Sequence, residues 1–463
     1  MASSKNPPKN NLAAGKKTSL LSQLKLFLRD FLLQQKRIQP SLLVAYSGGL
    51  DSTVLLHALH QLQTELPIQL RAMHVHHGLS ENADNWVSFC KQTCADLNIP
   101  FKTRQVRIDD ESRLGVEAAA RAARYQALSV EDSDYVCLGH HEDDQAETLL
   151  LQLARGAGVK GLAGMAKVDI KRRFIRPLLS SSRADLMAYA KQHKLQWIED
   201  DSNADTRFDR NFLRHELMPV FNRQYPSISQ TLARSASHMA QASELLDDLA
   251  KLDAEVVIDQ SHQYGALRLD GLNVLREARQ ANLVRWWLAN NQIDMPSTAL
   301  LTQILKQLQS KKTDAAIKVK VTESLYVMRY KALAFLVQEP KSLTPINLLW
   351  QGEEVVILPN LSRLFFRKKI GEGIAYKRGG SDLKLRIKNR EGGERFLPEL
   401  GRPRRGLKTI MQSIEMPPWQ REQLPLIFMD ETLAIIPNVG VDANLIAKSH
   451  EPGLVVSWQA AIS

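Results

Sequence analysis

The sequence contains few cysteines and no long apolar run. Its 463 residues include three cysteines, Cys90, Cys94 and Cys137, and no two of them form a Cys-x-x-Cys pair. We therefore expect no framework of disulfides, and a reducing cytoplasm is the expected location. No stretch of about 18 apolar residues occurs, so a transmembrane helix is not expected either.

The N-terminal segment also lacks the features of an export signal. Its first 20 residues contain four lysines, no acidic residue and no apolar core of signal-peptide length. Residues 1–40 are therefore interpreted as a basic tail and a leading helix. Nothing in the sequence indicates an obligatory protein partner.

Basic residues outnumber acidic ones, 61 to 50, and the excess is concentrated near the C-terminus. Between Arg363 and Lys408 there are fifteen basic and five acidic residues. Such a concentration attracts a polyanion by releasing its counterions, and a solvated basic face without a partner is the alternative. The candidates for contact with a nucleic acid are Arg367, Lys368, Lys369, Arg404, Arg405 and Lys408.

Strand-like and helix-like patterns alternate between residues 41 and 218. Short apolar or alternating segments predict strands at 42–46, 69–74, 102–108, 135–138 and 174–178. Helical spacing predicts helices at 52–62, 86–97, 118–128, 144–153 and 183–192. Repeated units of this kind indicate a doubly wound α/β domain whose parallel sheet is covered on both faces. Ligands are then expected beyond the carboxyl ends of the strands.

The pattern changes near residue 219. Residues 219–340 contain long segments rich in Leu and Ala and a strand-like stretch at 318–337, which together predict a mainly helical domain. Residues 341–345 are typical of a linker. Beyond them, frequent Pro and Gly and shorter segments predict a small, basic α+β domain over residues 345–463.

The strongest chemical signal is the segment Ser47-Gly48-Gly49-Leu50-Asp51-Ser52, which lies between the first predicted strand and its helix. Glycines allow backbone N–H groups to approach a phosphate, and the helix adds the positive end of its dipole. Ser47 and Ser52 can donate further hydrogen bonds. Asp51 is explained by a Mg²⁺ that bridges it to a triphosphate. A tight strand-to-helix turn is the structural alternative.

This segment resembles the motif of the PP-loop ATPases, which cleave ATP to AMP and diphosphate. The resemblance implies a parallel sheet of five strands in the order 3-2-1-4-5. His74-Val75-His76-His77 follows the second strand, where this family holds the adenine, so His74 and His76 are expected at the edge of the ATP pocket. A metal site built from these histidines is the alternative.

Further segments of interest are Gly115-Val116-Glu117, the run from Gly139 to Thr148, Arg176-Pro177-Leu178-Leu179, Trp197-Ile198-Glu199 and Arg210-Asn211-Phe212-Leu213-Arg214. With them, residues 42–214 resemble the tRNA(Ile)-lysidine synthetases without an evident gap. The C-terminal stretch 408–428 also resembles the last domain of the longer members of that family. The resemblance implies an ATP-dependent ligase that modifies a tRNA base. The middle and C-terminal domains would then bind the rest of the tRNA.

The reaction that this resemblance implies has two steps. ATP binds at the loop with Mg²⁺, and the C2 oxygen of the wobble cytidine in a tRNA(Ile) with a CAU anticodon attacks the α-phosphate. The ε-amine of free L-lysine then displaces AMP, which changes the codon read from methionine to isoleucine. A tRNA thiolase, a ligase that adenylates a small molecule and a non-catalytic RNA-binding protein are the alternatives.

Three acidic residues, Asp143, Asp144 and Glu147, are placed at the expected start of a helix. Asp144 and Glu147 share a helix face, so they are candidates for holding the ammonium groups of lysine. Capping of the helix is the alternative. His140 and His141 could contact a phosphate or orient the base, or could be buried structural histidines.

Two pairs of arginines complete the candidate site. Arg121 and Arg124 are candidates for contact with phosphate or tRNA, with a solvated helix face as the alternative. Arg210 and Arg214 lie four residues apart and suit the charge that develops in nucleotidyl transfer. Plain ion pairing with Asp200 or Asp201 is the alternative for this second pair. Together with Asp51, they are the predicted catalytic residues.

Overall fold

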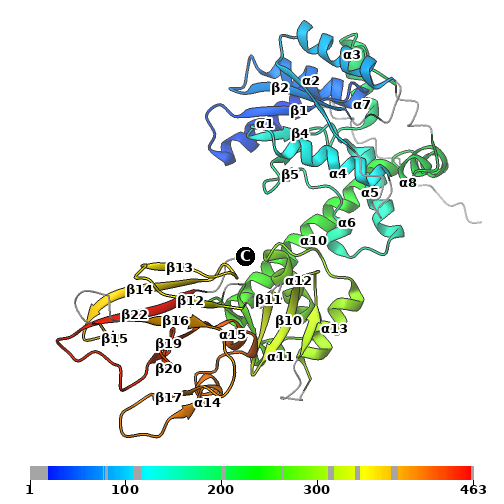
Figure 1. The fold of residues 1–463 in the computed structure, drawn as a ribbon. Coiled ribbons are helices and arrows are strands. Elements are labelled where there is room, and N and C mark those ends of the chain that lie inside the picture. Colours follow the sequence, from blue (N-terminus) through cyan, green and yellow to red (C-terminus); the bar gives the residue numbers. More distant parts are fainter. Residues whose placement is uncertain are drawn as a thin grey trace, which may run out of the picture. The chain divides into compact units, whose positions relative to one another are not determined.

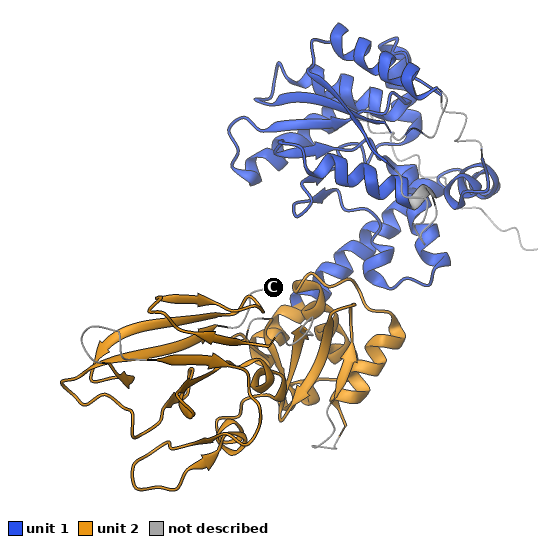
Figure 2. Ribbon diagram, viewed as in Figure 1, with its two compact units in different colours: residues 1–248 blue, residues 249–463 orange. Residues whose placement is uncertain are grey.

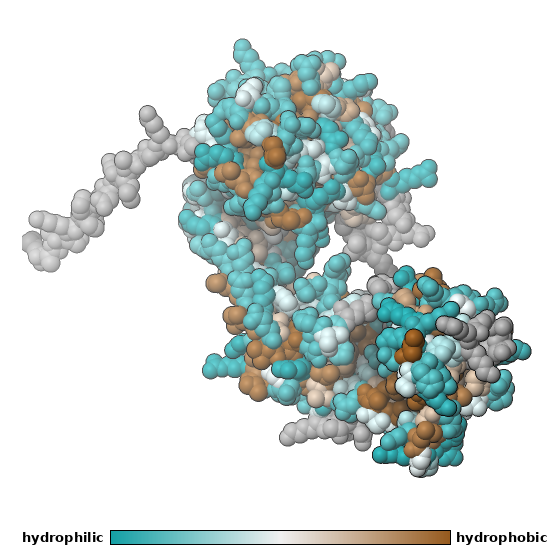
Figure 3. All heavy atoms as spheres, turned by 90° about the vertical axis from the view of Figure 1, so that its left-hand side faces the viewer, coloured by the Kyte–Doolittle hydropathy of each residue, from teal (hydrophilic) through white to brown (hydrophobic). Residues whose placement is uncertain are grey.

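The computed structural model describes residues 19–76, 78, 82–107, 116–199, 205–262, 264–310, 317–338, 345–376 and 384–459. The chain divides into two compact units, Met1–Asp248 and Leu249–Ser463, and each is treated by itself (Figure 2). Within the described ranges, no helix combines the length and the hydropathy of a membrane span. The face drawn in Figure 3 is largely hydrophilic, with hydrophobic residues scattered over it.

The first unit contains a mostly parallel sheet in the order β3-β2-β1-β4-β6-β5 (Figure 1). Its strands are β1 (Ser41–Ala45), β2 (Gln69–His76), β3 (Phe101–Gln105), β4 (Tyr135–Cys137), β5 (Val168–Asp169) and β6 (Phe174–Ile175). All neighbours pair in parallel except β5, which runs antiparallel to β6. The five parallel strands confirm the predicted order 3-2-1-4-5. The edge strand β5 was not predicted, because two residues carry no periodic pattern.

Helices cover both faces of this sheet. They are α1 (Leu20–Gln35), α2 (Leu50–Leu62), α3 (Ala83–Asp96), α4 (Val116–Ser129), α5 (Glu142–Ala154), α6 (Val159–Leu162) and α7 (Arg183–Gln192). After them come α8 (Asp209–Phe212), the π-helix η2 (Leu213–Leu217), α9 (Met218–Gln224) and α10 (Ile228–Val257), and the division between the units falls within α10.

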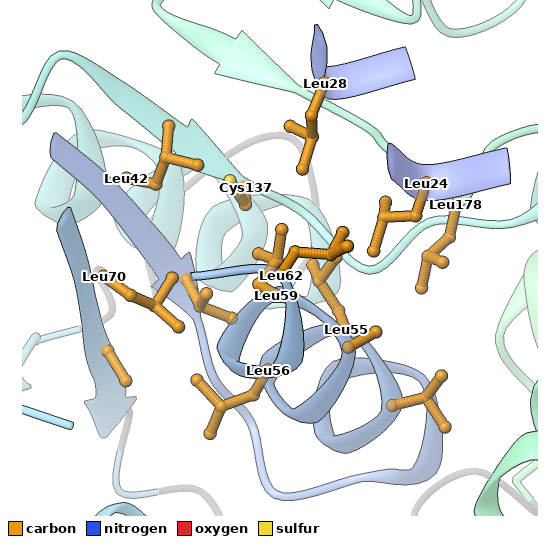
Figure 4. Close-up of a cluster of buried hydrophobic side chains, with 14 of the residues drawn as sticks. Leu24, Leu28, Leu42, Leu55, Leu56, Leu59, Leu62, Leu70, Cys137 and Leu178 are labelled. Carbon is orange, nitrogen blue, oxygen red and sulfur yellow. The ribbon is translucent and has the colours of Figure 1, made fainter. Parts of the chain in front are cut away.

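Alternation along β1 explains the two apolar cores of this unit. Leu42 and Val44 pack into a large cluster with leucines of α1 and α2, such as Leu28 and Leu59 (Figure 4). Leu43 points to the opposite face and joins a second cluster that includes Leu128 of α4. Successive side chains of a strand point to opposite faces, so a strand buried on both faces reads as a continuous apolar run. Each fully buried leucine stabilises the fold by roughly 1.5–3 kcal/mol.

The second unit begins with a helical and antiparallel portion. Its sheet has the order β7-β8-β11-β10-β9, formed by β7 (Ile258–Asp259), β8 (Ala266–Arg268), β9 (Lys318–Lys320), β10 (Leu325–Tyr330) and β11 (Leu333–Gln338). Its helices are α11 (Leu269–Val274), α12 (Glu277–Asn290) and α13 (Thr298–Leu308), and Trp287 lies at the centre of their core. The predicted helices are present, and the strand-like stretch at 318–337 corresponds to β9, β10 and β11. The short strands β7 and β8 were not predicted.

The C-terminal portion is built on two antiparallel sheets. One has the order β12-β16-β19-β20-β21 and the other β13-β14-β22-β15. Their strands are β12 (Asn347–Leu349), β13 (Val355–Ile357), β14 (Arg363–Ile370), β15 (Ile374–Ala375), β16 (Leu385–Lys388), β19 (Leu426–Met429), β20 (Thr432–Ile436), β21 (Gly440–Val441) and β22 (Pro452–Gln459). A hairpin of β17 (Arg395–Phe396) and β18 (Arg405–Gly406) and the helices α14 (Leu407–Ser413) and α15 (Pro418–Gln423) complete it. The predicted α+β class is confirmed, whereas the domain boundaries at 219 and 345 stay predictions.

Candidate active site at the carboxyl edge of the parallel sheet

The loop after β1 is held in one conformation by its own side chains. The Ser47 and Ser52 hydroxyl oxygens lie 3.0 Å apart, the Ser47 amide donates to Ser52 Oγ at 3.2 Å, and the Ser52 hydroxyl donates to the Gly49 carbonyl at 3.0 Å. Gly48 has a φ of +87°, in the left-handed region, and a Cβ on it would lie 2.7 Å from Ile198 Cδ1. The left-handed backbone therefore favours glycine at this position, and a larger residue would also have to displace the end of the Ile198 side chain.

The helix α2 begins directly after the glycines of this loop. Gly49 caps the helix without any side-chain hydrogen bond, so the first N–H groups of α2 are available to a ligand. These donors and the helix dipole favour an anionic group such as a phosphate. Ile198 lies against this loop, and its amide donates to the Gly48 carbonyl at 2.9 Å.

Asp51 lies in the first turn of α2, where a phosphate would bind. Its Oδ1 is buried without a hydrogen-bond partner, and its Oδ2 lies 3.6 Å from His141 Nε2. Mg²⁺ is typically held by one or two carboxylates together with substrate phosphates, so Asp51 suits a Mg²⁺ that arrives with ATP. No group of three His, Cys, Asp or Glu in the described ranges could hold a metal by itself.

The end of β4 lies directly against this turn. A Cβ on Gly139 would lie 3.2 Å from backbone atoms of Asp51 and Ser52, so only glycine permits the close approach. The following residues, His140 and His141, are thereby placed beside Asp51, and α5 begins there. The motifs after β1 and after β4 thus form one site.

His141 caps α5 and lies among three carboxylates. Its side chain is 1% exposed. Nε2 lies 3.6 Å from Asp51 and 3.5 Å from Asp144, and Nδ1 lies 3.5 Å from the Asp143 carboxylate. Burial by itself would lower the pKa of His141, but the neighbouring carboxylates of Asp143, Asp51 and Asp144 raise that pKa to about 10.

The protonation of His141 follows from this balance. Nδ1 also lies 3.2 Å from the Asp143 amide nitrogen, a contact that suits an unprotonated Nδ1. Three carboxylates outweigh one N–H dipole, so the imidazolium is the favoured form. Burial would raise the pKa of Asp143, but its bonds to His141, Ser229 and the Arg183 amide hold it well below the usual range.

Asp144 serves both the helix and the charge cluster. Its Oδ2 accepts the His141 amide at 2.9 Å, which caps the first turn of α5. Its Oδ1 lies 3.3 Å from Arg214 Nη2 and 3.5 Å from Arg210 Nη2. Burial would raise the pKa of Asp144, but the charges of His141 and Arg210 lower it. Capping and charge pairing therefore both occur at this residue.

Glu147 is 2% exposed and is held by two guanidinium groups. Arg210 Nε donates to Oε2 at 2.8 Å, and Arg214 donates from Nε to Oε1 at 2.7 Å and from Nη2 to Oε2 at 2.9 Å. The partners of these arginines are thus Glu147 and Asp144. Asp200 and Asp201, the partners considered from the sequence, lie outside the described residues.

The cluster as a whole carries one net negative charge. Its members are the carboxylates of Asp51, Asp143, Asp144 and Glu147 and the cations of His141, Arg210 and Arg214. A cationic ligand would add to this cluster by exchanging partners with the arginines. The geometry therefore suits a site that accepts an amine next to a phosphate-binding loop.

His140 lies beside the cluster but stays neutral. Burial lowers its pKa well below the usual value, because the attraction of Asp144 does not offset burial and the charges of Arg176, Arg121 and Arg210. Its Nδ1 is buried without a partner in the described structure. A neutral ring with one unused nitrogen suits contact with an uncharged base rather than with a phosphate.

Arg121 and Arg124 extend from α4 toward this region. The Arg121 guanidinium lies 5.1 Å from the centre of the Tyr125 ring and donates to its hydroxyl at 3.1 Å. Burial lowers the pKa of Arg124, and the charges of Arg121 and Arg210 act in the same direction. Contact with phosphate or tRNA stays a prediction for both arginines.

The two predicted histidines of β2 differ, since both ring nitrogens of His76 are buried without a hydrogen bond in the described structure. His74 Nδ1 lies 3.0 Å from the Tyr46 carbonyl oxygen, which ties β2 to the start of the loop. His76 Nε2 lies 3.3 Å from Asp84 Oδ1 of α3. His77, the third histidine of the proposed metal alternative, lies outside the described residues. A role of His74 and His76 at the ATP pocket stays a prediction.

Two buried side chains near the site were missed in the sequence. Arg176, 7% exposed, follows β6 and donates to the Ala166 carbonyl at 2.6 Å. Gln145 of α5 accepts the Met165 amide at 2.8 Å and donates to the Met165 carbonyl at 3.1 Å. Both hold the loop after α6. An arginine inside a predicted buried strand, at 174–178, was the available signal for the first.

The basic candidates of the second unit differ in their surroundings. Arg367 and Lys369 are exposed on alternate positions of β14, and Lys368 lies 5.1 Å from the ring of Tyr376. Arg405 and Lys408 are exposed. Arg404 instead pairs at 3.1 Å with Asp442, which is 0% exposed, so it neutralises a buried carboxylate.

Three family models match the chain in order. They are described as a PP-loop domain, over residues 18–221, a TilS substrate binding domain, over residues 267–332, and a TilS substrate C-terminal domain, over residues 385–458. The first covers the loop, the acidic cluster and Arg210 and Arg214. The ATP-using PP-loop class is therefore established for the first unit.

Curated relatives extend the match over most of the chain. A tRNA(Ile)-lysidine synthase of Nitrosomonas europaea is 39% identical over 92% of this chain and 93% of its own length. The chain belongs to the tRNA(Ile)-lysidine synthase family. Enzymes of the same name from Serratia proteamaculans and Coxiella burnetii are 40% and 38% identical, over 85% and 90% of this chain and 89% and 92% of theirs.

Proposed function

We propose that this enzyme joins L-lysine to C2 of the wobble cytidine of a tRNA(Ile) with a CAU anticodon, at the expense of ATP. The tRNA is adenylated first, and diphosphate and then AMP are released. The observation that carries the proposal is the contact between the phosphate-binding loop and the acidic cluster, in which Asp51 and Asp144 both lie within 3.6 Å of one histidine ring. One site thus offers donors for a triphosphate and carboxylates for an amine.

ATP binding is assigned to the loop from Ser47 to Ser52 and the open N-terminus of α2. Asp51 would hold a Mg²⁺, which neutralises phosphate charge when it is bound. The serine hydroxyls and the N–H groups of α2 orient the phosphates. His74 and His76 are assigned to the edge of the adenine pocket, on the resemblance to the PP-loop family.

The carboxylates of Asp144 and Glu147 are assigned to the ammonium groups of lysine. Both are buried, and both are paired with Arg210 and Arg214 in the structure. Entry of a cationic lysine frees the guanidinium groups, which can then stabilise the charge of the AMP that lysine displaces. The two arginines can therefore pair with the acidic residues before lysine binds and contribute to catalysis afterwards.

The base is assigned to the region of His140. The wobble base must be splayed out of its stack to reach the α-phosphate. The neutral ring of His140 can donate or accept one hydrogen bond at the edge of cytosine, whereas the charged His141 stays with its carboxylates. Arg121 and Arg124 are assigned to tRNA or phosphate contacts, and the exposed cations of β14, β18 and α14 to the rest of the tRNA.

A stoichiometric assay tests this proposal. The full chain is incubated with a tRNA(Ile) transcript that carries a CAU anticodon, ATP, Mg²⁺ and labelled lysine. We expect one lysine in tRNA for each AMP and each diphosphate released, and no incorporation into a transcript whose wobble cytidine is replaced. Release of diphosphate without lysine incorporation would point to a different acceptor. Sulfur incorporation from a sulfur donor would instead favour a thiolase.

A further inference from the structure

A second polar cavity lies at the opposite end of the parallel sheet. It has a volume of about 440 Å³ and is lined by Ser41, Arg71 and Ser133, among others. Ser41 is the first residue of β1, whereas the ATP loop follows the last residue of that strand. Five residues of a strand span roughly 16 Å at about 3.3 Å per residue. The cavity is therefore separate from the candidate active site.

Two arginines of this cavity have no carboxylate partner. Arg71 Nη2 donates to Ser41 Oγ at 3.2 Å and to the Asp132 carbonyl. Arg173 donates to the carbonyl oxygens of Ser133, at 2.7 Å, and of Ser129 and Glu131. Within the described part of the chain, no carboxylate oxygen lies within 4.0 Å of either guanidinium. Both charges are thus held by neutral acceptors alone.

Two acidic residues, Asp132 and Asp134, also line the cavity. Asp134 pairs with Arg37 at 3.3 Å and accepts the Ser41 amide at 2.9 Å. Asp132 is exposed. Three cations and two carboxylates line the cavity, so its balance is positive by one charge. That charge is located on the Arg71 and Arg173 side.

Two further donors at the same place have no partner. Ser133 is 5% exposed, and its hydroxyl oxygen is buried without a hydrogen bond. Arg71 Nε is also buried without an acceptor. A buried donor that lacks a partner costs about 1–3 kcal/mol, and an oxyanion is an acceptor for donors of this kind. Guanidinium groups bind such anions through parallel hydrogen bonds.

We propose that this cavity binds a small phosphate-bearing anion. Ser133, Arg71 and Arg173 all line the cavity, and a hydroxyl and two guanidinium groups are donors that suit an oxyanion. The volume exceeds that of a phosphate ion, so there is room for a group attached to it. In parallel sheets, ligands usually bind at the carboxyl ends of the strands, and this site lies at the amino ends.

Equilibrium dialysis of the full chain with labelled inorganic phosphate tests the proposal. A saturating non-hydrolysable ATP analogue occupies the loop at Ser47, and ionic strength is held constant with chloride. We expect one equivalent of phosphate to remain bound. Arg71→Gln and Arg173→Gln should each weaken this residual binding at least about tenfold. Arg172→Gln is the matched control, because Arg172 is exposed and points to Asp169 instead.

Several results would overturn the proposal. One is the absence of residual phosphate binding in the presence of the ATP analogue, and another is wild-type binding in Arg71→Gln. If Arg71→Gln lowers the melting temperature below the temperature of the assay, phosphate binding is measured on Arg71→Lys instead. Lysine keeps the positive charge but has no Nε. Wild-type phosphate affinity in Arg71→Lys would contradict the role of that atom. Full displacement of the phosphate by equimolar tRNA would reassign the cavity to the RNA backbone.

Discussion

Replacing Glu147 by glutamine separates the charge of the acidic cluster from helix capping. Asp144 caps α5 and also pairs with arginine, so its variants mix the two effects. Glu147 lies beyond the capping turn and contacts the guanidinium groups of Arg210 and Arg214. Glu147→Gln keeps the shape of the side chain and removes one charge. The cations of the cluster would then equal the carboxylates in number.

The expected loss of stability follows from burial. Breaking a buried ion pair by removing one partner costs about 3–5 kcal/mol. The Arg210 and Arg214 side chains are 20% and 28% exposed, and both can still reach Asp144. We therefore expect a loss of roughly 2–4 kcal/mol in the free energy of unfolding of the first unit.

The assay combines denaturation with kinetics. Urea unfolding of the full chain compares the stability of the variant with that of the wild type, and initial rates at varied lysine give the KM for lysine. Asp209→Asn is the control, because its pair with Arg155 is exposed on both sides and is worth less than about 1 kcal/mol. If Glu147 also receives the lysine ammonium, the KM for lysine should rise by about 30-fold or more, as expected when one partner of a desolvated pair is removed.

Two outcomes would refute this reasoning. An unfolding free energy equal to that of Asp209→Asn would mean that the two guanidinium contacts contribute no more than a surface pair. A lower stability with the wild-type KM for lysine would mean that Glu147 is structural, and the lysine site would have to be placed elsewhere.

Three other predictions follow from the site and the surface. Asp51→Asn should abolish diphosphate release and leave tRNA affinity nearly unchanged, as measured by a diphosphate assay and filter binding on one preparation. Replacing Arg367, Lys368 and Lys369 together by alanine should reduce the slope of log K for tRNA against log salt by roughly 0.7–0.9 for each cation that neutralises a phosphate in the wild type. The protonated ring of His141 stabilises the fold, because its pKa in the folded state is raised to about 10. This contribution is complete below pH 6.5 and diminishes as the pH rises toward about 10. The wild type should therefore lose more unfolding free energy than His141→Asn across that window, measured by urea titrations at each pH.

The order of the parallel strands could be anticipated because it follows from a local motif. The loop from Ser47 to Ser52 connects one strand to the next helix within six residues, and the family that it resembles has a fixed strand order. The short strands β4 and β6 lie within the apolar segments 135–138 and 174–178, which predicted them, whereas no such segment was recognised at β5, β7 and β8. These last three are defined by their neighbours in the sheet.

The pairing inside the candidate site could be anticipated only in part. Asp143, Asp144 and Glu147 are close in the sequence, so their common position at the start of α5 followed from spacing. The contact of Glu147 with Arg210 and Arg214 spans 63 and 67 residues, and no local pattern specifies it. The buried partner of Arg404, Asp442, was hidden for the same reason.

The mass of the modified nucleoside tests the central claim most directly. A tRNA(Ile) transcript with a CAU anticodon is incubated with the full chain, ATP, Mg²⁺ and L-lysine, then digested, and the wobble nucleoside is weighed by mass spectrometry. We predict that cytidine gains the mass of lysine less that of water, and only when ATP is present. An unchanged cytidine, or one in which sulfur replaces oxygen, would contradict the account.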